Sequence, residues 1–311
     1  MITGGASLGV NVANIHFQNP ILLAAGTADY GSSLAGVVSL DSLGGIVTKA
    51  VSVEPRHGNP SPRVAEFDGG MINAIGLANP GLEAVKRDKL PWLATHLTCA
   101  RVIVNVVGNS IDDFATVIAG LDDSDVVSAY ELNVSCPNVK AGGLEFGSDQ
   151  LALSSLVGRA RASTSRPIFV KLSPTLANIG FTAKVAVDAG ADGITVINTI
   201  PGLGIDVESR TPRIGFGTGG VSGQGLLPIG VLATWKVRTA VTVPIIGVGG
   251  VASASDALQY IIAGASLVAV GTAAMRDPGT PERIVKDLVS WCAAHNVSHL
   301  SALTGTLAWP S

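Results

Sequence analysis

Short apolar runs recur along the chain and alternate with stretches of helical spacing. Each run is continuously apolar, which is typical of a parallel strand that is buried on both faces. The eight strands predicted in this way are Pro20–Gly26, Gly44–Val51, Arg101–Gly108, Ala129–Val134, Pro167–Ser173, Gly193–Ile200, Val243–Gly250 and Leu267–Ala273.

Helical spacing between these runs predicts the other half of the fold. The predicted helices are Ser32–Leu43, Gly81–Ala94 with an interruption near Pro91, Ile111–Leu121, Asp149–Ala162, Ile179–Ala189, Leu226–Val241, Ser255–Ala263 and Pro281–His295. Eight strands that alternate with helices predict an α/β fold, the (β/α)₈ TIM barrel, as one domain over residues 1–311. A doubly wound open sheet is the structural alternative. Two segments rich in Gly and Pro, Glu54–Pro80 and Pro201–Gly225, are expected to be long loops.

Composition narrows the function classes. Hydrophobic residues make up 47% of the chain, charged residues 14%, and the formal net charge is −3, so no basic surface for nucleic acid is expected. No apolar run approaches the roughly 20 residues of a membrane span, and the first residues do not resemble a secretory leader. Three scattered cysteines fit a reducing compartment, so we expect a cytoplasmic protein. His295 and His299 are interpreted as solvated, and no metal site is expected.

Polar residues and glycines gather at the carboxyl ends of the predicted strands. They are Gly26, Lys49, Asn105, Asn133, Lys171, Asn198, Gly249 and Gly271. In a barrel these positions share one face, where this fold carries its chemistry. Lys49 and Lys171 together favour an anionic ligand or cofactor. The glycines of Gly247–Gly250 and Gly271–Thr272 favour a phosphate site, although tight turns without a ligand are the simpler interpretation of either one alone.

Cys136 follows the strand Ala129–Val134, in a polar loop that begins where Pro137 stops the strand. Two amides, Asn133 and Asn138, flank it and suit a planar polar ligand. A buried structural thiol is the commoner fate of a lone cysteine. In this loop, however, the thiol could be a nucleophile or a general base.

These motifs together resemble the dihydroorotate dehydrogenases, specifically the class 1B type. The matching segments are Asn19–Ile21, Lys49–Ala50, Glu54–Arg63, Asn73–Gly81, Leu132–Gly143, Ile197–Thr199, Thr218–Gly223, Gly247–Gly250 and Gly271–Thr272. The resemblance implies a barrel that holds FMN and oxidises (S)-dihydroorotate to orotate in pyrimidine (UMP) biosynthesis. It assigns Cys136 as the general base for the C5 proton, while a hydride passes from C6 to FMN.

The resemblance also assigns the binding residues. The substrate positions are Lys49, Asn73, Ala74, Ile75, Gly76, Leu77, Asn133, Asn198 and Thr199. The FMN positions are Ala25, Lys49, Ala50, Asn105, Asn133, Lys171, Ile197, Gly223, Gly249, Gly250, Gly271 and Thr272. At one of them the chain departs from the family, which usually has Ala-Ser-Gly where this sequence has Ala24-Ala25-Gly26. The missing hydroxyl contact costs about 0.5–1.5 kcal/mol if water does not replace it.

Class 1B members pair with a second subunit that carries FAD and a [2Fe-2S] cluster and passes electrons to NAD⁺. The three cysteines of this chain are too few for that cluster, so a partner chain around a homodimer core is expected. Three alternatives stay open: a class 1A-like enzyme that reduces fumarate, an oxidoreductase acting on another dihydropyrimidine, and a flavin-binding barrel without catalysis.

Overall fold

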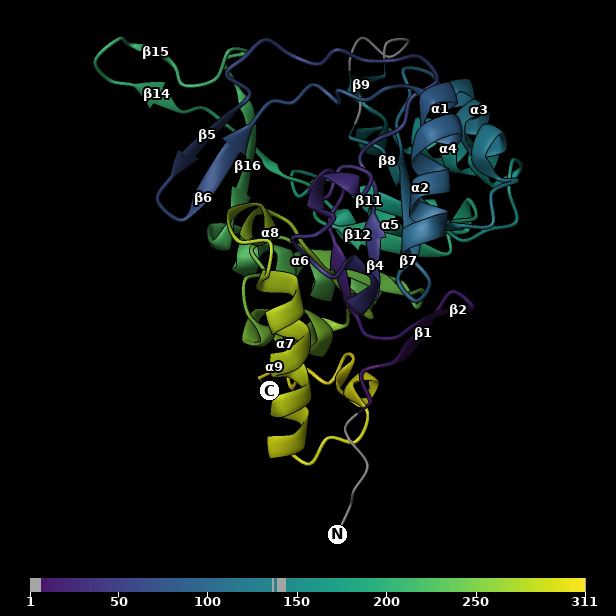
Figure 1. Ribbon diagram of the computed structural model, residues 1–311, viewed down its shortest axis with the longest axis vertical. Helices are drawn as coiled ribbons and strands as arrows, with labels where there is room; N and C mark the ends of the chain where they lie inside the picture. Colours follow the sequence, from purple (N-terminus) through teal and green to yellow (C-terminus); the bar gives the residue numbers. More distant parts are fainter. Residues whose placement is uncertain (1–6, 136, 139–143, 311) are drawn as a thin grey trace.

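The strands of the computed structural model close into a barrel (Figure 1). The structure describes residues 7–135, 137–138 and 144–310. The barrel strands are β3 (Ile21–Leu23), β4 (Gly45–Val47), β7 (Arg101–Val106), β8 (Val127–Asn133), β11 (Ile168–Leu172), β12 (Gly193–Val196), β17 (Ile245–Val248) and β18 (Leu267–Val270). Neighbouring strands pair in parallel all the way round, in chain order. The prediction of a (β/α)₈ barrel is therefore confirmed, and the open sheet is excluded.

Helices surround the barrel. Those of the described part are α1 (Leu82–Ala84), α2 (Leu90–His96), α3 (Ile111–Leu121), α4 (Gln150–Arg161), α5 (Ile179–Asp188), α6 (Leu227–Ala240), α7 (Ala254–Ala263), α8 (Thr272–Arg276) and α9 (Thr280–Ala294). A π-helical turn, Val85–Lys89, joins α1 to α2, with Pro91 in the first turn of α2. Short 3₁₀ turns lie at Phe146–Ser148, Gln224–Leu226 and Leu300–Leu303.

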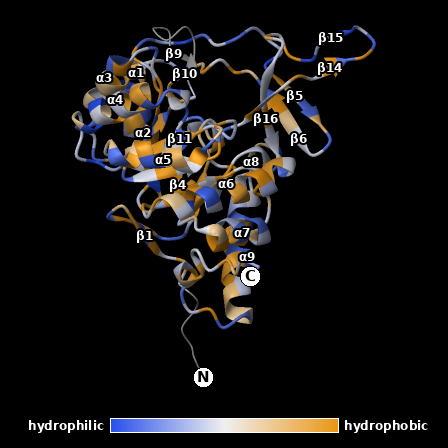
Figure 2. Cartoon of the chain, turned by 180° about the vertical axis from the view of Figure 1, so that it is seen from behind, coloured by the Kyte–Doolittle hydropathy of each residue, from blue (hydrophilic) through white to orange (hydrophobic). Residues whose placement is uncertain are grey.

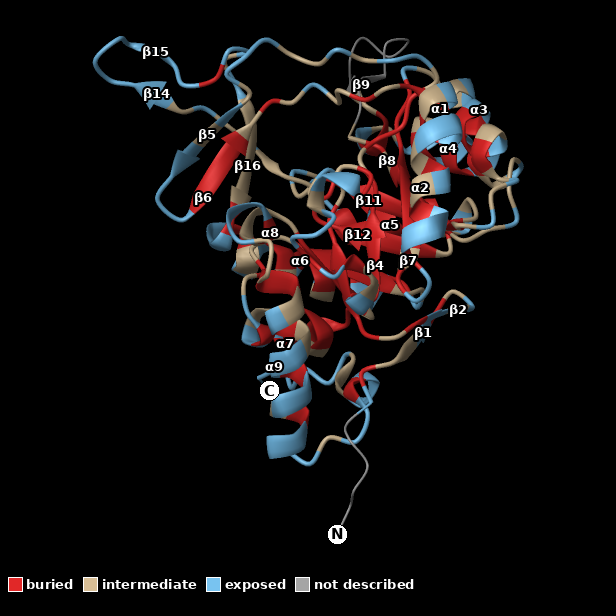
Figure 3. Cartoon of the chain, in the orientation of Figure 1, coloured by how far each residue is buried: buried red, intermediate tan, exposed pale blue. Residues whose placement is uncertain are grey.

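The barrel core has two layers because successive side chains of a strand point to opposite faces. Leu22, Ile103, Phe169 and Ile246 belong to the inner cluster, which Phe17 of the N-terminal hairpin β1 (Val10–Val12) and β2 (Ile15–Phe17) also joins. The alternate residues pack with the helices in a larger cluster. Figure 3 shows this continuous burial in the barrel strands, and Figure 2 shows the apolar residues that produce it.

One predicted helix is wrong. Ser32–Leu43 forms two 3₁₀ turns, Ser32–Leu34 and Leu40–Ser42, instead of one helix. Gly31 and Gly36 have φ values of 90° and 79°, which belong to the left-handed region and interrupt an α-helix. The first strand–strand connection of the barrel therefore lacks an α-helix.

The prediction that two long segments are loops is also wrong in part. They contribute the four strands of an antiparallel sheet, which we call the covering sheet: β13 (Ile200–Gly202), β16 (Gly219–Gly223), β6 (Gly70–Asn73) and β5 (Val64–Phe67), in that order. A further hairpin, β14 (Ile205–Asp206) and β15 (Thr211–Pro212), projects beyond it (Figure 1). A short ladder joins β9 (Pro137–Asn138) to β10 (Leu144–Glu145).

Candidate active site

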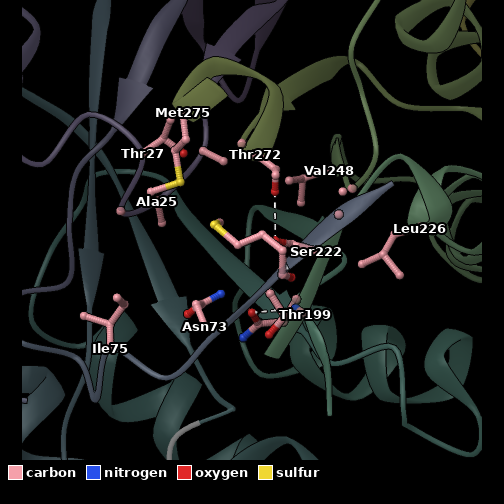
Figure 4. A pocket seen from close by; sticks show the side chains of 18 of the residues that line it. Ala25, Thr27, Asn73, Ile75, Thr199, Ser222, Leu226, Val248, Thr272 and Met275 are labelled. Carbon is pink, nitrogen blue, oxygen red and sulfur yellow. Dashed lines mark hydrogen bonds between the residues drawn. The ribbon is translucent and has the colours of Figure 1, made fainter. Parts of the chain in front are cut away.

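A cavity of about 720 Å³ lies where the carboxyl ends of the barrel strands meet the covering sheet (Figure 4). Its volume is in the range of sites for small molecules and cofactors. Barrel residues such as Asn105 and Lys171 line one side, and covering-sheet residues such as Met71 and Ser222 line the other. The site is thus assembled from a barrel mouth and a wall that comes from two distant loops.

Lys171, at the end of β11, is a cation of this cavity and is only 8% exposed. Its Nζ lies 3.8 Å from Oε1 of Glu131 on β8. The same carboxylate oxygen accepts a 2.7 Å hydrogen bond from Nδ2 of Asn105 on β7. Three adjacent strands therefore hold one buried polar cluster at the mouth of the barrel.

Lys49 follows β4 and also lines the cavity. Its Nζ is 3.3 Å from Oδ1 of Asp29, and both side chains are about one-third exposed. Arg276 of α8 is a third cation of the lining. In contrast, the described part of the lining contains no Asp, Glu or His. The electrostatic balance of this lining favours an anionic ligand.

Three further asparagines join Asn105 in the lining of the cavity. Asn198 donates a 3.4 Å hydrogen bond from Nδ2 to Oδ1 of Asn133, and its own Oδ1 accepts one from the Thr199 N–H at 2.8 Å. Asn73, at the end of β6, donates from Nδ2 to the Gly220 carbonyl at 3.3 Å. Amides carry donors and acceptors in one plane, so this group can bind the edge of a planar ring that has amide-like groups.

Glycines bring the main chain to the cavity wall. Gly249 and Gly250 follow β17 with φ values of 128° and 76°. A Cβ on Gly250 would lie 2.5 Å from the Leu227 nitrogen, and one on Gly223 would lie 2.4 Å from the Cα of Gly70. Only glycine fits these close approaches, and the resulting main-chain surface suits the oxygens of a phosphate.

Two buried tyrosines hold carbonyls of this lining. The Tyr260 hydroxyl donates to the Gly249 carbonyl at 2.7 Å, and the Tyr30 hydroxyl donates to the Ala50 carbonyl at 2.9 Å. Burial, with a smaller contribution from a nearby aspartate, raises the pKa of both hydroxyls well above the usual range. Both therefore stay protonated and remain donors.

The covering sheet is fastened to the barrel beside the cavity. Oγ1 of Thr272, the first residue of α8, donates to Oγ of Ser222 on β16 at 2.8 Å, as Figure 4 shows. The Arg276 guanidinium lies 3.6 Å from the Glu66 carboxylate on β5. The wall of the site is therefore tied to α8 by contacts at two positions.

The described binding residues of the sequence prediction all lie in the lining. These are Ala25, Lys49, Ala50, Asn73, Ala74, Ile75, Gly76, Leu77, Asn105, Asn133, Lys171, Ile197, Asn198, Thr199, Gly223, Gly249, Gly250, Gly271 and Thr272. Cys136, the predicted general base, lies outside the described residues. Its neighbour Ser135 lines the cavity, and the Ser135 Oγ is buried without a hydrogen-bond partner among the described residues. The roles of these residues stay predictions.

Sequence reasoning missed part of the wall. Met71, Ser222, Met275 and Arg276 line the cavity but were not singled out. The first two become neighbours of the site only through the pairing of β6 with β16, which joins segments some 147 residues apart, as in the Asn73–Gly220 contact. No local pattern reveals such a pairing. At position 25 no hydroxyl is present, but Thr27 contributes one to the lining two residues later.

The described residues contain no group of three or more His, Cys, Asp or Glu side chains placed to hold a metal ion. Among the described helices, none has both the length and the apolar character that crossing a membrane requires.

Comparison with known proteins places the chain in a family. The family model for dihydroorotate dehydrogenase matches residues 7–291. A protein of Pelobacter propionicus, named dihydroorotate dehydrogenase B (NAD(+)), catalytic subunit, is 43% identical over 298 residues, which are 96% of this chain and 97% of that protein. Proteins with the same name from Geobacter sp. (strain M21) and Geotalea uraniireducens are each 42% identical, over 96% and 98% of this chain and 98% and 99% of theirs. The chain therefore belongs to the dihydroorotate dehydrogenase family of oxidoreductases.

Proposed function

We propose that this chain is the catalytic subunit of an NAD⁺-linked, class 1B dihydroorotate dehydrogenase. It oxidises (S)-dihydroorotate to orotate in pyrimidine biosynthesis and holds FMN as its cofactor. The observation that carries the proposal is the lining of the cavity. Four asparagines, two lysines and a glycine-rich main-chain surface face one space at the barrel mouth, in a chain 43% identical to a protein of that name.

The cavity fits FMN in size and in chemistry. The main chain at Gly249, Gly250 and Gly271 lines the cavity and would hold the phosphate. Lys171 and Asn105 would hold the flavin ring, and the Lys171 cation would stabilise its electron-rich reduced form. FMN, when bound, supplies the acceptor for the hydride that leaves C6 of the substrate.

The substrate is an anionic ring with amide-like edges that becomes planar when it is oxidised to orotate. Asn73, Asn133 and Asn198 can hydrogen-bond those edges, and Lys49 can pair with the carboxylate. The covering sheet excludes water from the ring by closing the side opposite the barrel. These contacts would hold the substrate in one orientation, and such positioning lowers the barrier to reaction.

A base must remove the C5 proton as the hydride leaves. The described lining contains no Asp, Glu or His, and each of its two lysines is paired with a carboxylate. We assign the removal of this proton to the thiolate of Cys136, following the family resemblance. Substitution Cys136→Ala removes this base, and we expect a 10²- to 10⁴-fold loss in turnover with flavin content retained, since general-base catalysis contributes about that much.

A partner chain completes the proposal. The relatives are named catalytic subunits of an NAD(+) enzyme, which implies a second subunit in those proteins. We infer a homodimer core that binds an FAD- and [2Fe-2S]-carrying electron-transfer chain in a heterotetramer. We also infer a cytoplasmic location, since Cys99 and Cys292 are both free thiols.

Steady-state assays with different electron acceptors test the assignment. The purified chain should oxidise dihydroorotate with an artificial acceptor, but reduce neither NAD⁺ nor fumarate efficiently. Added electron-transfer subunit should restore NAD⁺ reduction. Efficient fumarate reduction would indicate class 1A instead. Turnover of a different dihydropyrimidine in preference to dihydroorotate, or of neither, would contradict the proposed substrate.

A further inference from the structure

Glu131 is a carboxylate inside the barrel that the proposed mechanism does not use. It lies near the end of β8, is 1% exposed and does not line the cavity. A charge that is buried so deeply is costly unless it is paired and hydrogen-bonded. Both side chains that compensate it, Lys171 and Asn105, do line the cavity. The carboxylate therefore touches the site only through two of its residues.

The barrel fixes this arrangement rigidly. In the strand register, Glu131 lies beside Asn105 of β7 on one side and beside Phe169 of β11 on the other. Lys171 comes two residues after Phe169, on the same face of β11. All three polar side chains thus point into the barrel. In the strand register, Lys171 lies one layer closer to the mouth than Glu131. Thr195 of β12 lies beside Lys171, and its buried hydroxyl has no partner among the described residues.

The Glu131 contact also determines which way the Asn105 amide points. Nδ2 of Asn105 is the atom that donates to Oε1 of Glu131 at 2.7 Å. The Asn105 carbonyl oxygen is then the group left for a ligand in the cavity. Without the carboxylate, the amide could rotate and present a donor in place of an acceptor.

We propose that Glu131 is a positioning residue that sets the affinity and the reduction potential of the cofactor. It holds the Lys171 ammonium at the barrel mouth, orients the Asn105 amide, and partly offsets the positive charge next to the bound ring. The inference rests on the proposed binding of FMN.

The other lysine of the site shows why this carboxylate matters more than a surface one. Asp29 pairs with Lys49, but both of those side chains are about one-third exposed, so water screens the pair. The Lys171–Glu131 pair is 10% and 1% exposed, and its charges act through a medium with little water. Removing the Glu131 charge should therefore change the reduction potential of an electron carrier bound in the cavity.

Glu131→Gln tests the charge while an acceptor for Asn105 remains. The loss of a negative charge favours the reduced cofactor, so the potential of bound FMN should rise. We expect a shift of about tenfold or more in the ratio of reduced to oxidised FMN at a fixed applied potential, which is about 30 mV for a two-electron couple. A purely structural role predicts a lower melting temperature with the potential unchanged, and that result would overturn the inference.

Two further variants make the test decisive. Asp192→Asn is the matched control, because Asp192 pairs with Arg161 at 2.8 Å at the start of β12, the other end of the barrel. The reduction potential of FMN bound to the Asp192→Asn variant should equal that of FMN bound to the wild type. Glu131→Asp keeps the charge but shortens the side chain. The ratio of reduced to oxidised FMN at a fixed applied potential should therefore stay within about twofold of the wild-type value. FMN should bind about tenfold more weakly to the apoprotein, as measured by flavin fluorescence.

The outcomes separate the two proposals. If Glu131→Gln does not fold, an unchanged FMN affinity of Glu131→Asp overturns the positioning role, and a weakened one supports it. A wild-type protein that binds no FMN would instead contradict the proposed function, independently of either variant.

Discussion

The barrel and the covering sheet form opposite walls of one cavity, yet they are built in different ways. The barrel strands are buried along their length, whereas β5 and β16 are mostly exposed or half-buried (Figure 3). The sheet has only a small apolar cluster of its own, formed by Ile72, Ala74 and Ile214. Since local stability follows buried apolar contact, the barrel should be a rigid floor and the sheet a wall that opens more easily. An active site can thereby combine fixed polar groups with access for its substrate.

The largest expected effect on stability comes from removing a large side chain from the barrel interior. Phe169 is fully buried, and the ring packs so closely on β12 that a Cβ at Gly193 would lie 2.4 Å from it. Phe169→Ala should lower the free energy of unfolding by about 3–5 kcal/mol, measured by denaturant titration. Phe181→Ala is the control, because that ring is 46% exposed on α5 and its loss should cost about 0.5 kcal/mol or less. Equal effects would contradict the rigid-floor description.

The second prediction concerns the wall. Ile72→Ala removes the central side chain of the small cluster, 4% exposed, and should cost about 2 kcal/mol, the low end for such a truncation. The loss should be local. Hydrogen exchange should accelerate in β5, β6 and β16 while β7 and β8 keep their protection. Equal acceleration in the barrel strands would show that floor and wall unfold together.

A pH-dependent contribution is expected at the end of the barrel away from the cavity. Asp41 accepts hydrogen bonds from the Thr98 hydroxyl and from the N–H groups of Thr98, Cys99 and Ala100. Burial alone would raise the pKa of this carboxyl, but these hydrogen bonds outweigh it and the pKa is lowered. The carboxylate therefore stabilises the fold above about pH 4, the unfolded pKa, and the contribution is lost as pH falls through the folded pKa.

Asp41→Asn measures that contribution. Because the side chain is partly exposed, we expect a loss of only about 1 kcal/mol at pH 7, and a smaller difference from wild type as the pH falls below about 4. Thermal unfolding at a series of pH values provides the comparison. A difference that grows toward acid would mean that the pKa is raised, contrary to this description.

The smallest effect is expected where the wall meets α8. Arg276 and Glu66 are 3.6 Å apart, with side chains 49% and 66% exposed. Glu66→Gln should change the free energy of unfolding by about 0.5 kcal/mol or less, and added salt should remove the difference. A larger, salt-independent loss would show that this ion pair fastens the covering sheet more firmly than its exposure suggests.

The same contrast explains what the sequence could reveal. Barrel strands such as β17 and β18 are continuous apolar runs. The polar residues near the strand ends, such as Asn105 of β7, were placed on one face by the geometry of the fold. The covering sheet depends on the pairing of β6 with β16, two strands that are distant in sequence and rich in glycine. No local periodicity of the sequence therefore predicts it. Glu131 was missed for a related reason. A charge within an apolar strand looks like part of the strand until its partners on two neighbouring strands are known.

Anaerobic titration of the purified protein with dihydroorotate tests the central claim most directly, because it requires the floor, the wall and the base to act on one cofactor. We expect a visible flavin spectrum that bleaches as dihydroorotate is added, with one orotate formed for each flavin reduced. A protein without flavin, or a bound flavin whose spectrum dihydroorotate leaves unchanged, would contradict it.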